Sequence, residues 1–475
     1  MINIDYYILS VLIKIYILSL TNYNMQKEEY DLIILGAGTG GVTIALYAAS
    51  HNIKTALVDP GDLGGICLNR GCIPTKAMLH ASHLHKLTGE MKQFGIEISK
   101  IEMNFQKIMK RVNEIVLQGR NSLTFNLKNK NITIIKNKGS FISQNEIKAG
   151  DKILKGKKII ICTGAKPKVP SIKGLEKVDY LLSDDILKIN SLPKSLIIVG
   201  GGYISLEFAT FFNDLGTKVY ILEALDRLIG SADFEISKEL EKYYVEDGVD
   251  IKTSVTISEI TKQKKGVKVL YTANGKNLFQ EAEEILIATG RAANTFSLNL
   301  EIAGIEKEKN GYIKVNEFLE TTDKNVYAIG DVNGKSLLAH AAKREAMIVI
   351  KNALENKKET MNFDLVPWAV FTSPPIAGIG ITDVEAKKRN IEAGIMKAEF
   401  KRVGKSIIIG ETRGLIKIIY NKKNNKLLGC FIIGDKSDEL IHEFSALLTA
   451  EATIDTMKKI IHIHPTLAEI VELLR

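Results

Sequence analysis

Two glycine-rich turns, each preceded by an apolar run, constrain the fold of this chain more than any other feature. The first run covers residues 30–35 and the second covers residues 195–199. The turns contain Gly36, Gly38 and Gly41 in the first copy, and Gly200 and Gly202 in the second, where Ser205 stands at the third glycine position. Such a turn from a buried parallel strand into a helix lets backbone amides approach a pyrophosphate. The repeat therefore predicts an α/β protein with two Rossmann-like dinucleotide-binding domains.

An acidic residue follows each turn at the same distance. Asp59 and Glu223 both end a second apolar run, 23 residues beyond the first glycine of their copy (36 to 59, 200 to 223). A carboxylate at this position accepts hydrogen bonds from ribose hydroxyls. Glu223 would accept the 2′-hydroxyl of NAD and repel the 2′-phosphate of NADP, so we expect NAD at the second site. The intact acid also disfavours the alternative that the second copy is a decayed structural unit.

Cys67 and Cys72 stand close together after the first turn, in the segment 64–76. In a regular helix, residues five apart have Cα atoms roughly 8–9 Å apart, whereas a disulfide needs about 4.4–6.8 Å. The pair can therefore bridge only where the helix is distorted. Gly71 beside Cys72 would let the turn tighten, and Pro74 suits the first turn of a following helix. A helix N-terminus stabilises a nearby thiolate, which favours a reactive redox pair.

Two other interpretations of the cysteine pair stay open at this point: a structural disulfide and one half of a metal site. Cys162 and Cys430 are the remaining cysteines, and each stands alone in the sequence. A four-cysteine zinc site is therefore not expected, and we predict no metal. Four cysteines in 475 residues are also too few for a secreted protein held together by disulfides. A redox pair fits best beside the nucleotide turns.

The composition is that of a soluble enzyme with several domains. Hydrophobic residues make up 45% of the 475 residues and charged residues 25%, enough to bury several cores. The formal net charge is +9, but basic residues are spread along the chain, and short runs such as 262–265 lack interleaved aromatic residues. Because a nucleic-acid binder concentrates its basic residues on one surface, we expect no nucleic-acid partner.

The first 24 residues are set apart from the rest. The apolar run 6–20 is interrupted by Lys14 and is short for a membrane span. Asp5 stands where a secretory signal would carry basic residues, and no small-residue cleavage site is clear. We expect residues 1–24 to be an extension ahead of a true start at Met25, a disordered segment or a weak anchor, with membrane attachment disfavoured. The expected location is the cytoplasm, with the mitochondrial matrix or another organelle as the alternative.

In their order and spacing, these motifs resemble those of the FAD-dependent pyridine nucleotide–disulfide oxidoreductases, over about residues 28–475. Further segments carry the resemblance: 163–167 and 288–291, which look like the family's Thr-Gly turns and contain Thr163, Gly164 and Gly290; 328–331, which looks like the second FAD motif and ends in Asp331; and 462–469, which looks like the C-terminal base motif. The resemblance implies two Rossmann-like domains, for FAD and NAD, and a C-terminal α+β dimerisation domain. Within the family, the chain is most similar to enzymes that oxidise dihydrolipoyl groups.

The resemblance also implies the catalytic residues. Cys67 would exchange with the substrate dithiol, and Cys72 would lie against the flavin as the charge-transfer thiol. His464 would be the acid–base, and Glu469 would orient its ring. A neutral imidazole can accept a thiol proton near pH 7, so this role suits the residue type.

Around the cofactors, the resemblance assigns three more side chains and Asp331. Lys76 would pair with Glu207 near the flavin ring, and Tyr203 would cover the flavin where nicotinamide enters. Asp331 would contact the ribityl chain of FAD. From the residues alone, Lys76 and Glu207 would be ordinary solvated helix positions, and Tyr203 could equally belong to a core. By contrast, His462 in the C-terminal motif is expected to be a surface or helix-face residue.

The implied activity is oxidation of protein-bound dihydrolipoyl groups through FAD, with reduction of NAD to NADH. The implied assembly is a homodimer in which the base of one subunit serves the disulfide of the other. No lipoyl-type domain is evident at the N-terminus, so the lipoyl arm would come from an acyltransferase of a 2-oxo acid dehydrogenase complex or from a glycine-cleavage carrier protein. The alternatives are an NAD(P)H-dependent disulfide reductase of the glutathione reductase type and, from another class, a non-catalytic binding protein.

The motifs divide the chain into five segments. They are an extension (1–24), an FAD domain with the cysteine pair (25–170), an NAD domain (171–290), a central domain that returns to the flavin (291–360) and a dimerisation domain (361–475). Alternating apolar residues predict an antiparallel sheet between 400 and 434, and helices are expected over 438–453 and 466–474. Pro375 stands where the family usually has an acid, a departure expected to alter local surface contacts but not the chemistry.

Overall fold

The computed structural model describes residues 26–128 and 131–475. The expectations for residues 1–24 lie outside the described residues. Contacts divide the described residues into two units: the first contains those up to Pro74 and those within 113–167 and 291–363, and the second contains residues 75–112, 168–290 and 364–475. The five-segment division stays a prediction. Within the described part of the chain, no helix combines the length and apolar character needed to cross a bilayer.

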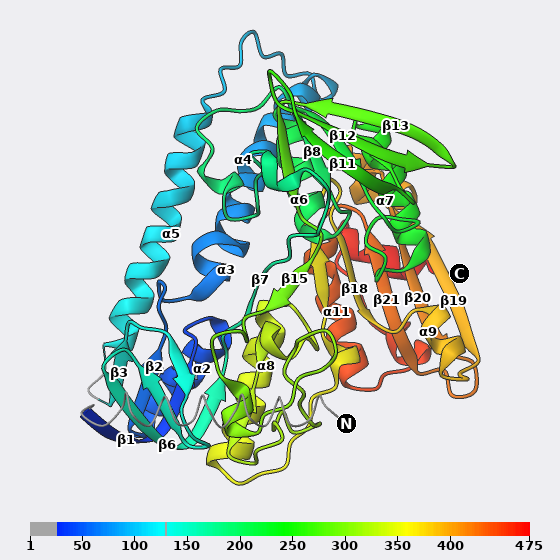
Figure 1. Ribbon diagram of the computed structural model, residues 1–475. Helices are drawn as coiled ribbons and strands as arrows, with labels where there is room; N and C mark the ends of the chain where they lie inside the picture. Colours follow the sequence, from blue (N-terminus) through cyan, green and yellow to red (C-terminus); the bar gives the residue numbers. More distant parts are fainter. Residues whose placement is uncertain (1–25, 129–130) are drawn as a thin grey trace. The chain divides into compact units, whose positions relative to one another are not determined.

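A seven-stranded sheet forms the centre of the first unit, in the order β3-β2-β1-β6-β5-β4, with β16 beside β6 (Figure 1). Its strands are β1 (Gln26–Leu35), β2 (Thr55–Val58), β3 (Ile132–Ile135), β4 (Gly139–Phe141), β5 (Glu146–Ala149), β6 (Lys152–Ile161) and β16 (Val326–Ala328). Pairings β1–β2, β1–β6, β2–β3 and β6–β16 are parallel, whereas β4 and β5 are antiparallel additions. Ile34 stands opposite Leu57 and Ile160, and all three are buried. The continuous apolar runs thus belong to strands covered on both faces.

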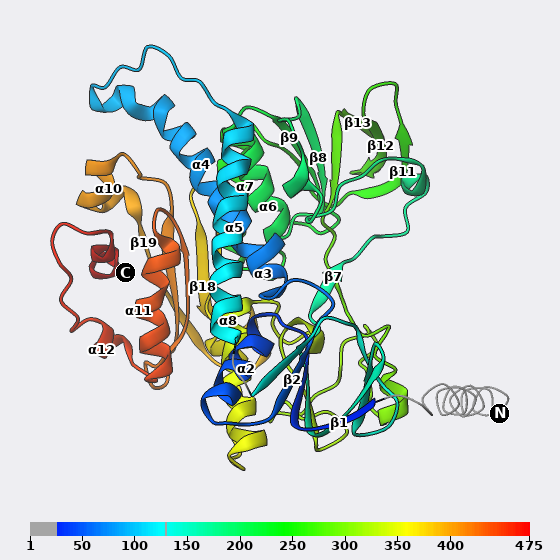
Figure 2. The same cartoon turned by 90° about the vertical axis from the view of Figure 1, so that its left-hand side faces the viewer.

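Helices from distant parts of the chain cover this sheet. α2 (Thr39–Ser50) follows the first glycine turn, and α8 (Ala339–Val349) packs against it (Figure 2). The other elements that begin in this unit are α3 (Gly65–Arg70), α4 (Cys72–Glu90), β7 (Ala165–Pro167), β15 (Arg291–Ala293), the 3₁₀-helices η4 (Leu300–Ala303), η5 (Gly330–Asn333) and η7 (Phe363–Leu365), and the π-helix η6 (Ile350–Leu354). β7 and β15 pair antiparallel. α4 and α5 (Phe105–Leu127) each run across a unit boundary.

The first part of the second unit repeats the strand–turn–helix pattern. A parallel sheet has the order β10-β9-β8-β14, and an antiparallel sheet has the order β11-β12-β13. The strands are β8 (Ser195–Val199), β9 (Lys218–Leu222), β10 (Asp250–Lys252), β14 (Glu284–Ile287), β11 (Thr256–Lys262), β12 (Val267–Ala273) and β13 (Lys276–Ala282); the helices are α6 (Tyr203–Asp214) and α7 (Phe234–Glu246). Phe208, Phe211 and Phe212 of α6 share one buried core with Met78 and Leu79 of α4. This packing fixes α6 beside α4, and both helices carry predicted site residues.

The last part of the second unit is a five-stranded antiparallel sheet, in the order β17-β18-β21-β20-β19. The elements are β17 (Trp368–Val370), β18 (Ile376–Gly380), α9 (Asp383–Lys388), β19 (Ala393–Glu399), η8 (Phe400–Arg402), α10 (Gly404–Ile409), β20 (Leu415–Asn421), β21 (Leu427–Ile433), α11 (Ser437–Thr449), α12 (Ile454–Met457) and η9 (Leu467–Leu473). α11 packs on β18 and β21 (Figure 2). This arrangement buries the apolar faces of the sheet and α11 together.

The sequence prediction for residues 400–434 is partly wrong. β20 and β21 lie in this range, but residues 400–409 form two short helices, and three further strands precede them. Ile407 and Ile408 are 63% and 60% exposed, whereas Phe400 is fully buried, so this apolar run does not alternate across a sheet. The predicted helix 438–453 ends earlier, at Thr449, and the last helix is of the 3₁₀ type.

Candidate functional site

The first glycine turn is built so that side chains are excluded at two points and space is left at a third. Gly36 has φ +110°, and a Cβ there would lie 2.3 Å from the carbonyl oxygen of Cys162. A Cβ on Gly41 would lie 2.0 Å from the carbonyl oxygen of Gly36. At Gly38, by contrast, an added Cβ meets nothing within 4 Å, and α2 begins there without a side-chain cap. This open space beside the helix N-terminus suits a pyrophosphate.

The second turn has the same construction. Gly200 has φ +108°, and a Cβ there would lie 2.5 Å from the carbonyl oxygen of Ala288. Gly202 is open in the manner of Gly38, and α6 begins after it without a side-chain cap. Ser205 is fully buried at the third position. Two separate turns therefore fit the phosphates of two dinucleotides.

Both acids that follow the turns are held by backbone amides. Asp59 accepts hydrogen bonds from the amides of Ala37 (2.6 Å) and Gly61 (2.7 Å). Glu223 is buried and accepts from the amides of Gly201 and Leu225, the latter at 2.6 Å. Each carboxylate is thus fixed next to its own glycine turn, where the ribose of a dinucleotide would follow the pyrophosphate.

The cation nearest in sequence to Glu223 is already engaged. Arg227 forms an ion pair with Asp226 at 3.1 Å, and its Nη2 donates to the carbonyl oxygen of Gly230 at 2.6 Å. An arginine that binds a 2′-phosphate must offer its guanidinium to the ligand. These contacts, together with the fixed acid, favour NAD over NADP.

Around Asp331, burial raises the pKa of two carboxyl groups. Arg291 Nε lies 3.5 Å from Asp331 Oδ2, and burial raises the pKa of Asp331 while this arginine lowers it. Glu345 of α8 is fully buried, and burial raises its pKa to about 7. Its Oε2 accepts from the amide of Gly330 (2.6 Å) and from Asn333 Nδ2 (3.0 Å), so Glu345 fixes the turn that carries Asp331.

The sequence reasoning missed Glu345, although a signal was present. The residue lies among the other buried positions of α8, which are Ala341, Ala342, Ala346, Ile348 and Val349. A charged residue on the apolar face of a helix marks a position where a carboxyl group must find polar partners.

The two predicted residues Thr163 and Gly164 are hydrogen-bonded to a distant part of the chain. Thr163 Oγ1 donates to the carbonyl oxygen of Asn294 at 2.9 Å, and the amide of Asn294 donates to the carbonyl oxygen of Gly164 at 2.9 Å. Gly290, at φ +115°, ends the other Thr-Gly segment.

A break in the helix separates the two cysteines of the predicted pair. Cys67 lies in α3, Cys72 is the first residue of α4, and Gly71 between them has φ −139° and ψ −110°. Pro74 stands in the first turn of α4. The structure therefore has the distortion that a disulfide at this spacing requires.

The other two cysteines are in different surroundings. Cys162 and Cys430 are buried, and burial raises the pKa of each thiol well above its ordinary value. Thiols in such surroundings are inert, because the reactive form is the thiolate. Cys67 and Cys72, by comparison, are half-buried. No group of metal-ligating residues is found among the described residues.

The structure brings Lys76 and Glu207 together. Lys76 Nζ lies 2.6 Å from Glu207 Oε1, and the carboxylate side chain is 7% exposed. The same oxygen accepts from the amide of Phe371 at 3.3 Å, and Lys76 Nζ lies 4.5 Å from the centre of the Phe371 ring. Tyr203, the first residue of α6, is 36% exposed. Phe371 was not singled out from the sequence, since an isolated aromatic residue carries no signal of its partners.

His464 and Glu469 also form the predicted pair. His464 Nδ1 lies 2.8 Å from Glu469 Oε1, and 79% of the histidine side chain is exposed. Glu469 Oε2 accepts from the amide of Thr466 at 2.8 Å, in a capping box at the start of η9. The hydrogen bond from His464, followed by that from Thr466, holds the pKa of Glu469 below its usual value. An ionised carboxylate is therefore held against one nitrogen of the ring.

The expectation for His462 is wrong. Its side chain is 5% exposed, and its ring nitrogens lie 3.2 Å from Glu443 Oε1 and 3.3 Å from Glu472 Oε1. Neighbouring Ile461 and Ile463 are exposed instead. The partners of the histidine come from α11 and η9, so no pattern within the motif itself could have shown its burial.

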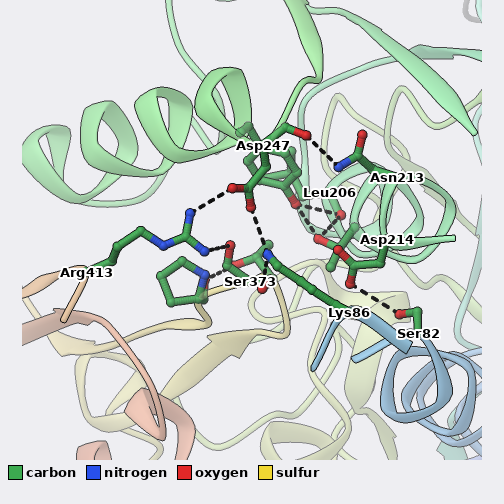
Figure 3. A network of polar contacts seen from close by, with 12 residues as sticks. Ser82, Lys86, Leu206, Asn213, Asp214, Asp247, Ser373 and Arg413 are labelled. Atoms are coloured by element: carbon green, nitrogen blue, oxygen red, sulfur yellow. Dashed lines mark hydrogen bonds and ion pairs between the residues drawn. The ribbon is translucent and has the colours of Figure 1, made fainter. Parts of the chain in front are cut away.

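A network of ion pairs and hydrogen bonds links α4 to three loop segments of the second unit (Figure 3). Lys86 Nζ of α4 lies 2.9 Å from Asp247 Oδ2 and donates to Ser373 Oγ at 2.9 Å. Arg413 Nη1 lies 2.9 Å from Asp247 Oδ1. Asp247 thus joins the helix that carries Lys76 to the C-terminal sheet region of the same unit.

Asp214, the last residue of α6, lies beside this network. Ser82 Oγ donates to Asp214 Oδ2 at 3.4 Å (Figure 3). Burial raises the pKa of Asp214 to about 7; Asp247 and Glu90 act in the same direction, whereas Lys86 and the Ser82 hydroxyl oppose it. The carboxyl group therefore titrates near neutrality, in contrast to an exposed aspartate.

The predicted catalytic residues are divided between the two units. The cysteine pair belongs to the first unit, and His464 with Glu469 belongs to the second. The glycine turn and acid of the first copy, with Asp331, are also in the first unit. Those of the second copy, with Lys76, Glu207 and Tyr203, are in the second.

Comparison with known proteins gives the family context. Residues 30–346 match the pyridine nucleotide-disulphide oxidoreductase family, and residues 366–475 match the dimerisation domain of that family. Dihydrolipoyl dehydrogenase of Chlamydia pneumoniae is 34% identical over 449 residues, which cover 94% of this chain and 96% of that protein. Mercuric reductase of Lysinibacillus sphaericus is 30% identical over 446 residues, which cover 94% of this chain and 82% of that protein.

Among solved structures, the HOCl-induced flavoprotein disulfide reductase RclA from Escherichia coli is similar, with a TM-score of 0.84 and 30% identity, covering 94% of this chain and 99% of that chain. The predicted α/β fold with a C-terminal dimerisation domain is confirmed. Members of this family are FAD-dependent and use NAD(P)H, so the predicted cofactor classes are confirmed as well.

Proposed function

The chain belongs to the pyridine nucleotide–disulphide oxidoreductase family, and we propose that it oxidises dihydrolipoyl groups carried by proteins and reduces NAD. The observation that carries the proposal is the His464–Glu469 pair. The carboxylate fixes the imidazole, yet 79% of the histidine side chain is exposed. An exposed, oriented base suits a dithiol that arrives on the surface of another protein. The relative named dihydrolipoyl dehydrogenase, aligned over 94% of the chain, supports the same substrate class.

The thiol step needs the dithiol and residues of this chain alone. One substrate thiol gives its proton to His464, and its sulfur attacks Cys67, which breaks the Cys67–Cys72 disulfide and forms a mixed disulfide. The second substrate sulfur then displaces Cys67, so the substrate leaves as a disulfide and the two cysteines gain two electrons. Glu469 stabilises the imidazolium while His464 holds the proton.

The described residues fit the two cofactors. Bound FAD would supply the two-electron chemistry that connects the cysteines to NAD. For FAD we assign Gly36, Gly38, Gly41, Asp59, Thr163, Gly164, Lys76, Glu207 and Asp331, and for NAD we assign Gly200, Gly202, Tyr203, Glu223 and Gly290. The open positions Gly38 and Gly202, each at an uncapped helix N-terminus, are the observation that supports a dinucleotide in both places.

We assign the base and the cysteine pair that it serves to different subunits of a homodimer. The match of residues 366–475 to the family's dimerisation domain supports this assembly. Ile461 and Ile463, on either side of the motif's first histidine, are 93% and 78% exposed, so covering them would remove apolar surface from water. The further partner would be a lipoyl-bearing acyltransferase of a 2-oxo acid dehydrogenase complex or a glycine-cleavage carrier protein.

A reductase that works from NAD(P)H towards a disulfide is the second candidate. Its support comes from the RclA structure and from the mercuric reductase relative. Fixed Glu223 argues against NADP as the reductant of such an enzyme.

Steady-state assays would separate the candidates. The purified holoenzyme is given dihydrolipoamide with NAD, glutathione disulfide with NADPH, and Hg²⁺ with NADPH. The proposal expects turnover in the first assay to exceed that in the other two by orders of magnitude. Higher kcat/KM with glutathione disulfide or Hg²⁺ would overturn it.

A cysteine variant tests the redox pair itself. We expect Cys72→Ser to keep its FAD absorbance and lose dihydrolipoamide turnover, because no disulfide can form. Cys430→Ala, which alters a thiol in the core of the C-terminal sheet, is the matched control and should keep both. Unchanged turnover in Cys72→Ser would refute the assignment.

A further inference from the structure

The segment that carries His464 has one buried side chain between exposed ones. Residues 461–466 lie between α12 and η9 and have no regular secondary structure. Ile461 is 93% exposed, Ile463 is 78% exposed, and 79% of the His464 side chain is exposed. His462, in contrast, has a side chain that is only 5% exposed. Within residues 461–464, the side chain that packs into the protein is therefore a histidine and not one of the isoleucines. We call His462 the anchor of this segment.

Both nitrogens of the buried ring face carboxylates from different elements. His462 Nε2 lies 3.2 Å from Glu443 Oε1 of α11, and Nδ1 lies 3.3 Å from Glu472 Oε1 of η9. The imidazole ring has one nitrogen on each side that can take part in a hydrogen bond, and each nitrogen faces its own carboxylate. The imidazole is thus held from both sides by side chains of two different elements.

The ring also lies near the carboxylate that orients the base. The pKa of Glu469 is lowered mainly by its hydrogen bonds with His464 and with the amide of Thr466, and His462 adds a small contribution in the same direction. Glu469 in turn holds His464 Nδ1 at 2.8 Å. His462 is thus connected to His464 in two ways: through the chain, with Ile463 between them, and through Glu469.

We propose that His462 is a positioning residue for the dithiol step: it ties the segment 461–466 to α11 and η9 and so holds His464 in place. This inference rests on the proposed function, in which His464 is the base. Without the anchor, the backbone next to His464 would lose its tie to α11 and η9. The position of the His464 side chain would then depend on its hydrogen bond with Glu469. Since small misplacements of a catalytic group cost large factors in rate, loss of the anchor lowers kcat more than it raises KM.

The test is a double-mutant cycle between the two histidines. His464→Gln first tests the proposed function, because it must itself abolish most dihydrolipoamide turnover. His462→Gln is expected to lower kcat for dihydrolipoamide by roughly 10- to 100-fold, with a much smaller change in KM. Added to His464→Gln, it should cause almost no further loss, because it acts through a base that is no longer present.

The controls separate positioning from general damage. His442→Gln changes an exposed histidine next to Glu443 and should leave turnover unchanged. NADH-dependent ferricyanide reduction, FAD absorbance and size-exclusion chromatography report whether each variant is folded. If His462→Gln does not fold, Glu472→Gln takes its place, because this half-exposed partner can still accept a hydrogen bond but lacks the charge.

Two results would overturn the inference. One is wild-type kcat in His462→Gln, or in Glu472→Gln where that variant is used. The other is a loss that is equally large in the His464→Gln background, which would mean that His462 does not act through the base. If His464→Gln keeps full turnover, the failure lies instead with the proposed function.

Discussion

Asp214 offers a quantitative test of how the second unit is held together. The carboxyl group is bonded to Ser82 and lies beside the Lys86–Asp247 pair, and burial raises its pKa from 3.8 to about 7. The folded protein therefore keeps a proton on Asp214 that the unfolded chain loses above about pH 4. Because the folded form binds more protons in this range, the contribution of Asp214 to stability is most favourable below pH 3.8 and becomes less favourable as the pH rises through about 7.

The size of the effect follows from the shift. A difference of about 3 pKa units, at about 1.4 kcal/mol each, corresponds to a penalty of up to about 4 kcal/mol above pH 7. Near pH 5 the penalty is about 1.6 kcal/mol, because the unfolded carboxyl group is already ionised. Asp214→Asn removes the titration while keeping the size of the side chain. Its stability relative to the wild type should therefore increase by roughly 2–3 kcal/mol between pH 5 and pH 8.5.

Urea unfolding at the two pH values, followed by far-UV circular dichroism, measures this change as a shift in midpoint. Infrared spectroscopy near pH 6 provides a direct check, since the carbonyl band of protonated carboxyl groups should lose the component of Asp214 in the variant and keep that of Glu345. Glu246→Gln is the control, because Glu246 is an exposed carboxylate at the end of α7, and this variant should show neither effect. A difference between Asp214→Asn and wild type that does not vary with pH would refute the burial argument.

Two further predictions concern the cofactor residues. Glu223→Arg should shift the ratio of kcat/KM values from NAD towards NADP, since it removes the carboxylate that opposes a 2′-phosphate; an unchanged ratio would show that Glu223 does not determine specificity. Lys76→Met should destabilise the protein by about 1–3 kcal/mol, because it leaves the Glu207 carboxylate buried without its cation. Thermal unfolding of the double variant Lys76→Met/Glu207→Gln should recover part of this loss, and equal instability of single and double variants would contradict the pairing.

The parts of the fold that follow from local backbone geometry could be predicted from the sequence. Gly36 and Gly200 have positive φ angles and backbone oxygens within reach of any added Cβ, so their positions in the turns leave no other residue possible. The break at Gly71 follows equally from the spacing of the cysteines. These constraints act within a few residues of the motif and can be read there.

The parts that depend on distant partners could not be predicted. The side chain of His462 is only 5% exposed because it contacts Glu443 and Glu472 from two other elements, and nothing within residues 461–466 indicates this. Residues 400–409 form helices where a strand was predicted. The prediction assumed that the apolar run would be buried, but Ile407 and Ile408 are exposed. Pairs such as Lys76 and Glu207 were found because a family pattern supplied the partner that spacing alone cannot.

The way in which Asp59 and Glu223 are held has a thermodynamic consequence for nucleotide binding. Each carboxylate is already oriented by two main-chain N–H groups before any ligand arrives. Little rotamer freedom is left to lose on association, so the entropic cost of ordering these side chains has been met during folding. Selection between one nucleotide and another then depends on the fit of the ribose substituent to a rigid acceptor, and an induced rearrangement of the acid has no part in it.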